Sequence, residues 1–210
     1  MKKDWRDFFW PSYVDLLTGL FIVMLVLFIL SYKLLGDKLR GTEYKLQRFT
    51  QMQRIDKQIS ELNKSSFFEY QDQFKRHILK AKIIFDPNQS IIKNEYKSEL
   101  LEAGKALHDF LDSIFVNNEK KVKFLVVIEG NAANTFDNLF PKDSRYGYRL
   151  SYERALSLYK FWSDNKILRS GDPKFEVLIA GSGFSGVGRD TLEDNNKRFI
   201  VQILPKLGEK

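Results

Sequence analysis

The chain has 210 residues, enough for one domain with appendages, and its 34 basic and 27 acidic residues give a net charge of +7. The two signs are interleaved without an arginine-rich run, which disfavours nucleic-acid binding and favours a solvated surface beside anionic polymers or lipid headgroups. The absence of cysteine excludes disulfides and cysteine-based metal sites or nucleophiles. Because only two histidines occur and no nucleophile–base pair, phosphate loop or metal cluster stands out, we expect neither an enzyme nor a bound cofactor.

An almost uninterrupted apolar stretch runs from Val14 to Tyr32. About 20 such residues are enough for a helix to cross a bilayer. The stretch is longer than the apolar part of a typical secretory signal, and no small-residue cleavage motif follows it, so we expect a retained anchor. The sequence therefore predicts a tail at 1–12 and a transmembrane helix at 13–35. Basic residues flank both ends of the span, so charge alone does not decide the orientation.

The next segment, 36–66, is predicted to be a helical linker. Its apolar residues recur mostly at three- and four-residue steps and form one stripe on an otherwise polar helix. The stripe consists of Leu39, Leu46, Phe49, Met52, Ile55, Ile59 and Leu62. A single apolar stripe needs a partner, and we expect a parallel dimer stalk, with packing against the following domain as the alternative.

The remainder of the chain, 67–210, alternates strand and helix patterns. Strands are expected at Lys80–Phe85, Val122–Ile128, Phe175–Ala180 and Arg198–Leu204, and helices at Asn94–Phe115 and Leu150–Trp162. This alternation predicts a small α/β domain with its helices packed on one face of a mixed sheet.

One carboxylate, Asp15, lies about one turn inside the apolar span, where a charge costs about 2–3 kcal/mol on insertion scales. Three- and four-residue spacing puts Ser12, Thr18 and Gly19 on the same face of the helix. Hydroxyls beside a carboxylate can coordinate a cation or orient water, and a glycine lets another helix approach closely. We therefore expect Asp15, Ser12 and Thr18 to form an ion-carrying site. The alternative is an interfacial carboxylate that the helix dipole favours.

Two parts of the chain resemble a known family. Residues 10–21 (WPSYVDLLTGLF) resemble the start of the single span of MotB-type stator subunits, where an aromatic residue, a short spacer and an aspartate precede Leu/Met-Thr. The C-terminal region resembles the OmpA-like peptidoglycan-binding domain. Its matching strings are Ile128–Gly130, Leu150–Ala155, Gly181–Gly183 and Asn196–Arg198. The order of the parts, an aspartate-bearing span, a linker and such a domain, is more specific than either part alone.

The resemblance implies the B subunit of a rotary motor in the bacterial inner membrane. Such subunits form a homodimer inside a ring of five multi-span A-type subunits, and their aspartate carries H⁺ or Na⁺ down the membrane gradient. The OmpA-like domain at 67–210 is then periplasmic and bound to peptidoglycan, and the tail at 1–12 is cytoplasmic. The implied partners are a second copy, the A-type subunit, peptidoglycan and the lipid bilayer, with no nucleic acid.

The resemblance also implies a peptidoglycan pocket. In the family, an aspartate takes the ammonium of diaminopimelate and the arginine of an LSxxRA helix takes its carboxylate, by charge-assisted hydrogen bonds. Arg154 matches that arginine, but Ala133 stands where the aspartate is expected. The implied binding residues are Arg154, Ser151, Asn131, Asn134, Asp137 and Arg198, with Asn134 or Asp137 replacing the aspartate. The alternatives are that Arg154 is a surface arginine and that Arg198 caps a strand edge.

Among such motors, the layout most resembles the B subunit of the Zorya anti-phage defence system. The shared features are a short N-terminal tail, a compact linker and a modified OmpA-like domain, without the long basic tail of flagellar subunits. A flagellar-type stator subunit and a plain membrane-tethered peptidoglycan anchor are the two alternatives.

Overall fold

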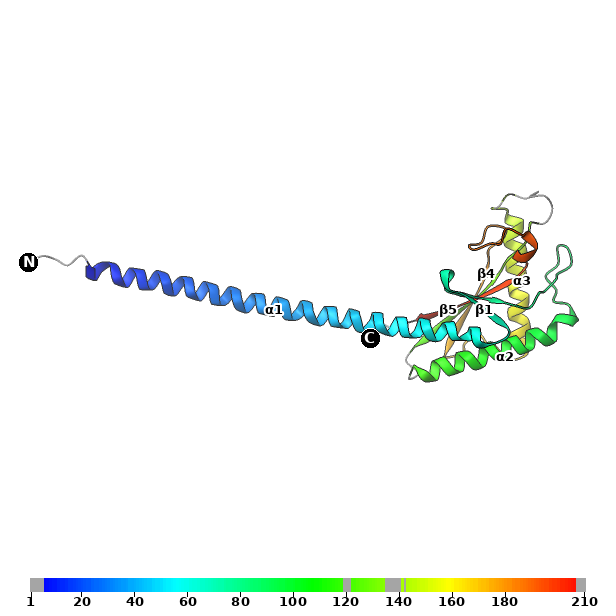
Figure 1. Cartoon of the computed structure of the whole chain (residues 1–210), viewed down its shortest axis with the longest axis horizontal. Helices are drawn as coiled ribbons and strands as arrows, with labels where there is room; N and C mark the ends of the chain where they lie inside the picture. The colour runs from blue at the N-terminus through cyan, green and yellow to red at the C-terminus, as the bar shows by residue number, and fades with distance from the viewer. Residues whose placement is uncertain (1–5, 119–121, 135–140, 142, 207–210) are drawn as a thin grey trace, which may run out of the picture. The chain divides into compact units, whose positions relative to one another are not determined.

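The computed structural model describes residues 6–118, 122–134, 141 and 143–206, with side chains from residue 13 onward. The chain divides into two compact units, Met1–Gln53 and Arg54–Lys210, which are described separately below. Figure 1 traces the elements in chain order, from blue at the N-terminus to red at the C-terminus.

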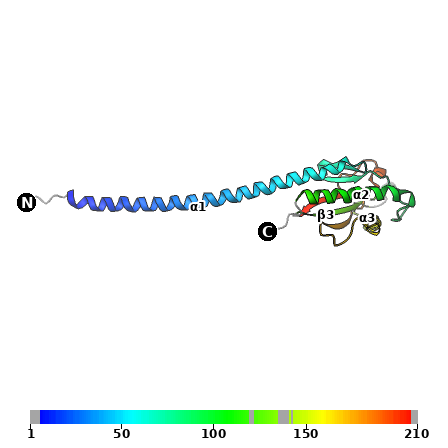
Figure 2. The same ribbon diagram turned by 90° about the horizontal axis from the view of Figure 1, so that it is seen from below.

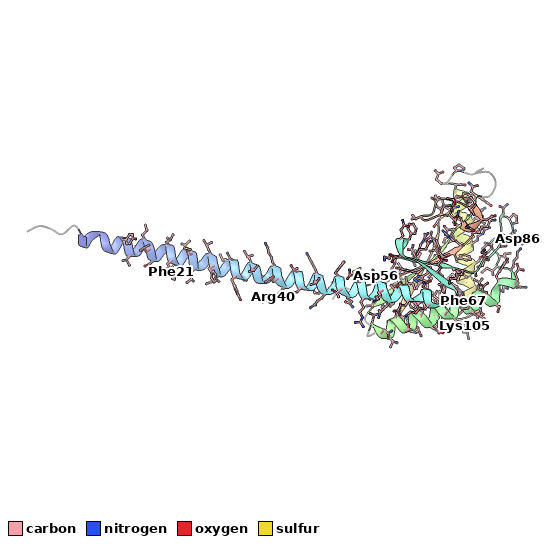
Figure 3. All side chains as sticks on the ribbon, viewed as in Figure 1. Phe21, Arg40, Asp56, Phe67, Asp86 and Lys105 are labelled. Carbon is pink, nitrogen blue, oxygen red and sulfur yellow. The ribbon has the colours of Figure 1, made fainter. Side chains whose placement is uncertain are left out.

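The first unit is formed by a single long helix, α1 (Arg6–Ser60), whose last turns belong to the second unit. The helix is long and apolar enough to cross a membrane. All the side chains of residues 13–35 are exposed, and Figure 3 shows them projecting around the ribbon near Phe21. An apolar surface of this extent needs a non-aqueous surrounding, in agreement with the expected span. Gly36 lies inside α1 without interrupting it, because one glycine costs a helix only about 1 kcal/mol.

The apolar stripe of the predicted stalk is divided between the two units. Ile55, Ile59 and Leu62 are buried in the hydrophobic core of the second unit. Its other members, Leu39, Leu46, Phe49 and Met52, are exposed in the first unit. Packing against the domain therefore accounts for the last three positions, and a dimer through the remaining ones stays a prediction.

The second unit is built on a five-stranded sheet with the strand order β1-β2-β5-β3-β4. The strands are β1 (Phe68–Gln71), β2 (Arg76–Leu79), β3 (Lys123–Gly130), β4 (Phe175–Gly181) and β5 (Phe199–Lys206). The β3–β4 pair is parallel and the other pairs are antiparallel, so the sheet is mixed as expected. Short 3-10 turns occupy Glu61–Lys64, Asp72–Phe74 and Glu193–Asn196.

The strand expected at Lys80–Phe85 is not part of the sheet. The chain there is irregular, and β2 ends at Leu79, one residue earlier. Ala81 and Ile83 are buried whereas Lys82 and Ile84 are exposed, which reproduces the alternation of a strand. The alternation therefore reflects one-sided burial against the core without ladder hydrogen bonds.

Two helices, α2 (Asn94–Asn117) and α3 (Arg145–Asp164), pack on the same face of the sheet. Figure 2 shows both helices beside β3. The core contains the inward residues of alternating strand positions together with one stripe from each helix. It includes Phe124, Val126 and Ile128 of β3, Leu100 and Leu107 of α2, and Leu158 and Trp162 of α3. The expected fold class, one N-terminal apolar helix followed by an α/β domain with helices on one face of a mixed sheet, is confirmed.

Candidate functional site

A small cavity lies in the second unit, beyond the end of β3. Its volume is about 10 Å³, the room that about one water molecule takes. It is lined by Ile83, Phe85, Asn131, Arg154, Lys197, Arg198 and Phe199. Three of these seven residues are cationic and none is acidic, so the chemistry of the cavity suits an anion.

The N-terminal half of α3 is fixed against the ends of β3 and β4 by backbone contacts. A Cβ atom on Gly130 would lie 2.2 Å from the backbone oxygen of Ser151, so only glycine fits at this point. The hydroxyl of Ser151 accepts a hydrogen bond from the backbone N–H of Gly183 (2.9 Å) and donates one to the carbonyl of Tyr148 (3.0 Å). Ser151 is fully buried. Ser151 thus lies near the cavity, and its hydrogen bonds link α3 to the turn after β4.

Arg154 lies one turn further along α3, and its charged side chain forms part of the cavity wall. The residue is 8% exposed, which contradicts the alternative of a surface arginine. Its Nε donates a hydrogen bond to the carbonyl of Gln89 (3.1 Å), and its guanidinium lies over the ring of Phe85, 4.7 Å from the centroid. Burial lowers the pKa of Arg154, although a guanidinium stays protonated in proteins.

The other two cations, Lys197 and Arg198, lie just before the start of β5. Arg198 donates from Nη2 to the carbonyl of Gly188 (2.7 Å), and its Nε is buried with no hydrogen-bond partner among the described residues. Burial lowers the pKa of Arg198, and the carboxylate of Asp190 opposes that effect. Lys197 forms an ion pair with Asp194 (2.7 Å). Arg198 therefore lines the cavity and has one buried N–H without a partner among the described residues.

The two asparagines occupy different places. Asn131 lines the cavity, and its backbone N–H donates to the carbonyl of Arg198 (3.2 Å). Asn134 lies further along the loop, where its backbone N–H donates to Glu193 (3.0 Å). Glu193 in turn pairs with Arg189 (2.6 Å). Asp137 falls outside the described residues. Arg154, Asn131 and Arg198 are thus brought together at the cavity, with Ser151 as a neighbouring support.

The second candidate site, around Asp15, lies in the first unit. The hydroxyl of Thr18 donates a hydrogen bond to the carbonyl of Val14 (2.8 Å), so its oxygen lone pairs are left to accept. A Cβ atom on Gly19 would meet nothing within 4 Å. The side chain of Ser12 falls outside the described part of the chain. All these residues come from one helix, so a complete ion path needs groups from another helix.

Sequence reasoning missed four members of the cavity wall, namely Ile83, Phe85, Lys197 and Phe199. Lys197 lies in the Asn196–Arg198 string, for which a binding role was expected of Arg198 alone. Phe85 is the last residue of the segment that was predicted to be a strand. Nothing in the sequence indicated that its ring would lie under Arg154. Over the described residues, no group of three acidic, histidine or cysteine side chains is placed to hold a metal ion.

No family model and no curated protein matches the chain. Several solved structures are similar to it. An outer membrane protein of Borrelia burgdorferi B31 is 19% identical, with 65% of this chain and 95% of the other covered and a TM-score of 0.40. The periplasmic domain of Helicobacter pylori MotB is 13% identical, with 66% and 84% covered and a TM-score of 0.40. The peptidoglycan-associated lipoprotein of Burkholderia pseudomallei is 16% identical, with 59% and 88% covered and a TM-score of 0.33.

Proposed function

We propose that the chain is a single-pass inner-membrane protein whose periplasmic domain binds peptidoglycan through the cationic cavity. The observation that carries this proposal is Arg154, a nearly fully buried cation at a cavity that Arg198 also lines. A buried guanidinium without an acidic partner is costly unless a ligand supplies the negative charge. The apolar stretch of α1 supplies the membrane anchor, and the OmpA-like and MotB-type resemblance supports the cell wall as the ligand.

Co-sedimentation of the detergent-solubilised full chain with purified peptidoglycan sacculi tests this proposal. The wild-type chain is expected in the pellet, and Arg154→Gln is expected largely in the supernatant because the charge that meets the wall is removed. Arg149→Gln is the matched control, since Arg149 lies on the same helix but is exposed and away from the cavity. Equal pelleting of Arg154→Gln and wild type contradicts the proposal.

The finer proposal is that the anchor serves an ion-driven rotary motor. Asp15 would carry H⁺ or Na⁺, with Thr18 and Ser12 as neighbouring oxygen groups. A carboxylate in an apolar span is expensive and is usually retained for a function of this kind. A multi-span A-type subunit, in five copies, would supply the other wall of the ion path. In this proposal the protein has no enzymatic activity and no cofactor, and its cargo is the ion. Anti-phage defence is the preferred role and flagellar rotation the alternative.

A homodimer through the exposed part of α1 completes this proposal. Leu35, Leu39, Thr42, Leu46 and Phe49 follow alternating four- and three-residue steps, as the two inward positions of a coiled-coil heptad do. In a parallel pair of helices in register, Lys38 and Glu43 would occupy facing flank positions of opposite charge. Since the chain has no cysteine, Leu46→Cys is expected to cross-link two copies under oxidation, and Gln51→Cys, on the outer face, is not. The reverse pattern would contradict this seam.

The motor proposal is tested by Asp15→Asn in cells that carry the chain with its chromosomal neighbours. Asp37→Asn is the control, because Asp37 lies on the same helix beyond the apolar span. We expect Asp15→Asn to abolish phage protection, or swimming for a flagellar motor, while copurification with the A-type subunit is kept. Normal function of Asp15→Asn would refute the ion-carrying role and leave the plain anchor as the function.

A further inference from the structure

The cavity contains more positive charge than the described residues neutralise. Lys197 is balanced by its ion pair with Asp194. Arg154 and Arg198, in contrast, make no ion pair with a carboxylate anywhere in the described ranges; their hydrogen bonds there go to the backbone carbonyls of Gln89 and Gly188. Among the described residues, the two guanidinium groups therefore hydrogen-bond only to carbonyl groups, with the Phe85 ring beside Arg154 and the charge of Asp190 acting on Arg198 from outside the cavity lining.

The carboxylates of Asp190, Glu69 and Glu129 act on the charge of Arg198, but from outside the cavity lining. Glu193 accepts hydrogen bonds from Arg189 and from the backbone of Asn134. Asp190 accepts from the backbone N–H of Leu192 (2.9 Å) and from Asn195 (3.1 Å), and these bonds hold the pKa of Asp190 below its usual value. Neither carboxylate lines the cavity. A ligand ammonium in the cavity would therefore meet two like charges and no counter-charge among its described lining residues.

We infer that the cavity selects a ligand that presents a carboxylate without an ammonium group close by, such as an N-acylated amino acid within a peptide. This inference rests on the proposed binding of the wall and specifies the part of the wall peptide that the cavity takes. Each guanidinium contributes donors suited to a carboxylate, and Arg198 Nε, buried and without a partner in the described structure, supplies one more. The volume of about 10 Å³ is the room of about one water-sized group, which a carboxylate oxygen would fill. An ammonium beside that carboxylate adds repulsion in a poorly solvated place.

A matched pair of ligands tests this selectivity. Meso-diaminopimelate and its N,N′-diacetyl derivative carry the same two carboxylates, but only the first carries ammonium groups. Isothermal titration calorimetry of the full chain in detergent is expected to show the diacetyl derivative binding at least about tenfold more tightly, a difference of about 1.4 kcal/mol. Equal binding, tighter binding of free diaminopimelate, or no measurable binding of either ligand would overturn the inference.

An isosteric variant lowers the positive charge of the cavity without changing its shape. Asn131 lines the cavity, and Asn131→Asp places one carboxylate there beside Arg154 and Arg198. The preference for the diacetyl derivative is expected to fall by at least about tenfold. An unchanged ratio in Asn131→Asp would refute the inference even if Arg154→Gln failed to fold. Circular dichroism establishes that each variant has kept its helical content.

The sacculus experiment separates this inference from the proposed function. Pelleting with sacculi, without discrimination between the two small ligands, would keep wall binding and refute the selectivity. Discrimination between the ligands without pelleting would keep the selectivity and refute wall binding.

Discussion

His77 makes the stability of the second unit depend on pH. The side chain lies in β2 with no exposed surface, and the ring of Tyr70 stands 4.9 Å from it. Burial lowers its pKa from 6.5 to about 4, and the backbone at Ile59 and Val201 opposes part of that effect. The unfolded chain binds a proton on His77 more readily than the folded chain. The contribution of His77 to the free energy of unfolding is therefore complete above pH 6.5, and it is lost as the pH drops toward 4.

The expected magnitude follows from the two pKa values. A difference of about 2.5 pH units, at about 1.36 kcal/mol for each unit, gives about 3 kcal/mol for the complete effect. Most of this loss is expected between pH about 6.5 and about 4.5, at a slope of about 1.36 kcal/mol per pH unit. His77→Gln removes the titrating group, so its unfolding free energy should lack this slope, whereas the contribution of the carboxylates stays the same in both proteins.

Trp162 provides the assay, because it is fully buried in the core of the same unit. In a background of Trp5→Phe and Trp10→Phe it is the sole tryptophan of the three in the chain, so its fluorescence reports the domain alone. Urea unfolding of the full chain in detergent is followed at several pH values for both proteins. If the wild-type and His77→Gln free energies fall in parallel from pH about 6.5 to about 4.5, burial of a neutral His77 is refuted.

Three further substitutions address the packing around the site. Gly130→Ala should lower the free energy of unfolding by about 3 kcal/mol, because its Cβ would lie 2.2 Å from the carbonyl oxygen of Ser151 and would push α3 away. Ser151→Ala should lower the free energy of unfolding by about 2 kcal/mol, because the buried N–H of Gly183 loses its acceptor. Gly104→Ala should lower the free energy of unfolding and red-shift the fluorescence of Trp162, whose Nε1 would lie 2.5 Å from the new Cβ.

The same urea assay checks these three predictions. Gly41→Ala is the control, since a Cβ at Gly41 meets nothing within 4 Å and an alanine favours a helix. Unfolding midpoints of Gly130→Ala and Ser151→Ala that equal those of wild type would contradict the close approach of α3 to the sheet. An unshifted emission maximum in Gly104→Ala would contradict the contact with Trp162.

Elements with a long continuous apolar pattern could be predicted from the sequence. Val122–Ile128 is continuous in apolar character, and it corresponds to β3 within two residues at each end. The strands β1 and β2 were not predicted, because each has only four residues and β2 contains Arg76 and His77, two polar residues that are buried. Their burial is imposed by tertiary packing, which a local pattern does not record.

The residues of the cavity likewise show that a local sequence pattern does not record tertiary contacts. The match of Arg154 to an LSxxRA string located the central cation. Its hydrogen bond to Gln89, 65 positions earlier in the chain, and its contact with Phe85 in the same loop are not visible in a local pattern. The stripe of the predicted stalk was one pattern in the sequence, yet Ile55 and Ile59 are in the core whereas Leu46 is exposed. Helical spacing identifies an apolar face, and it does not identify the partner that covers each part of it.

The contact between Gly130 and Ser151 also bears on how this kind of site can diversify. Arg154 follows Ser151 by one helical turn, so a backbone contact sets the position of its charge. The neutral and cationic neighbours, Asn131 and Arg198, come from segments that flank strand ends, where substitutions disturb the core least. Substitutions in those segments are therefore expected to change the specificity proposed for the cavity, while the contact between Gly130 and Ser151 keeps the central arginine in place.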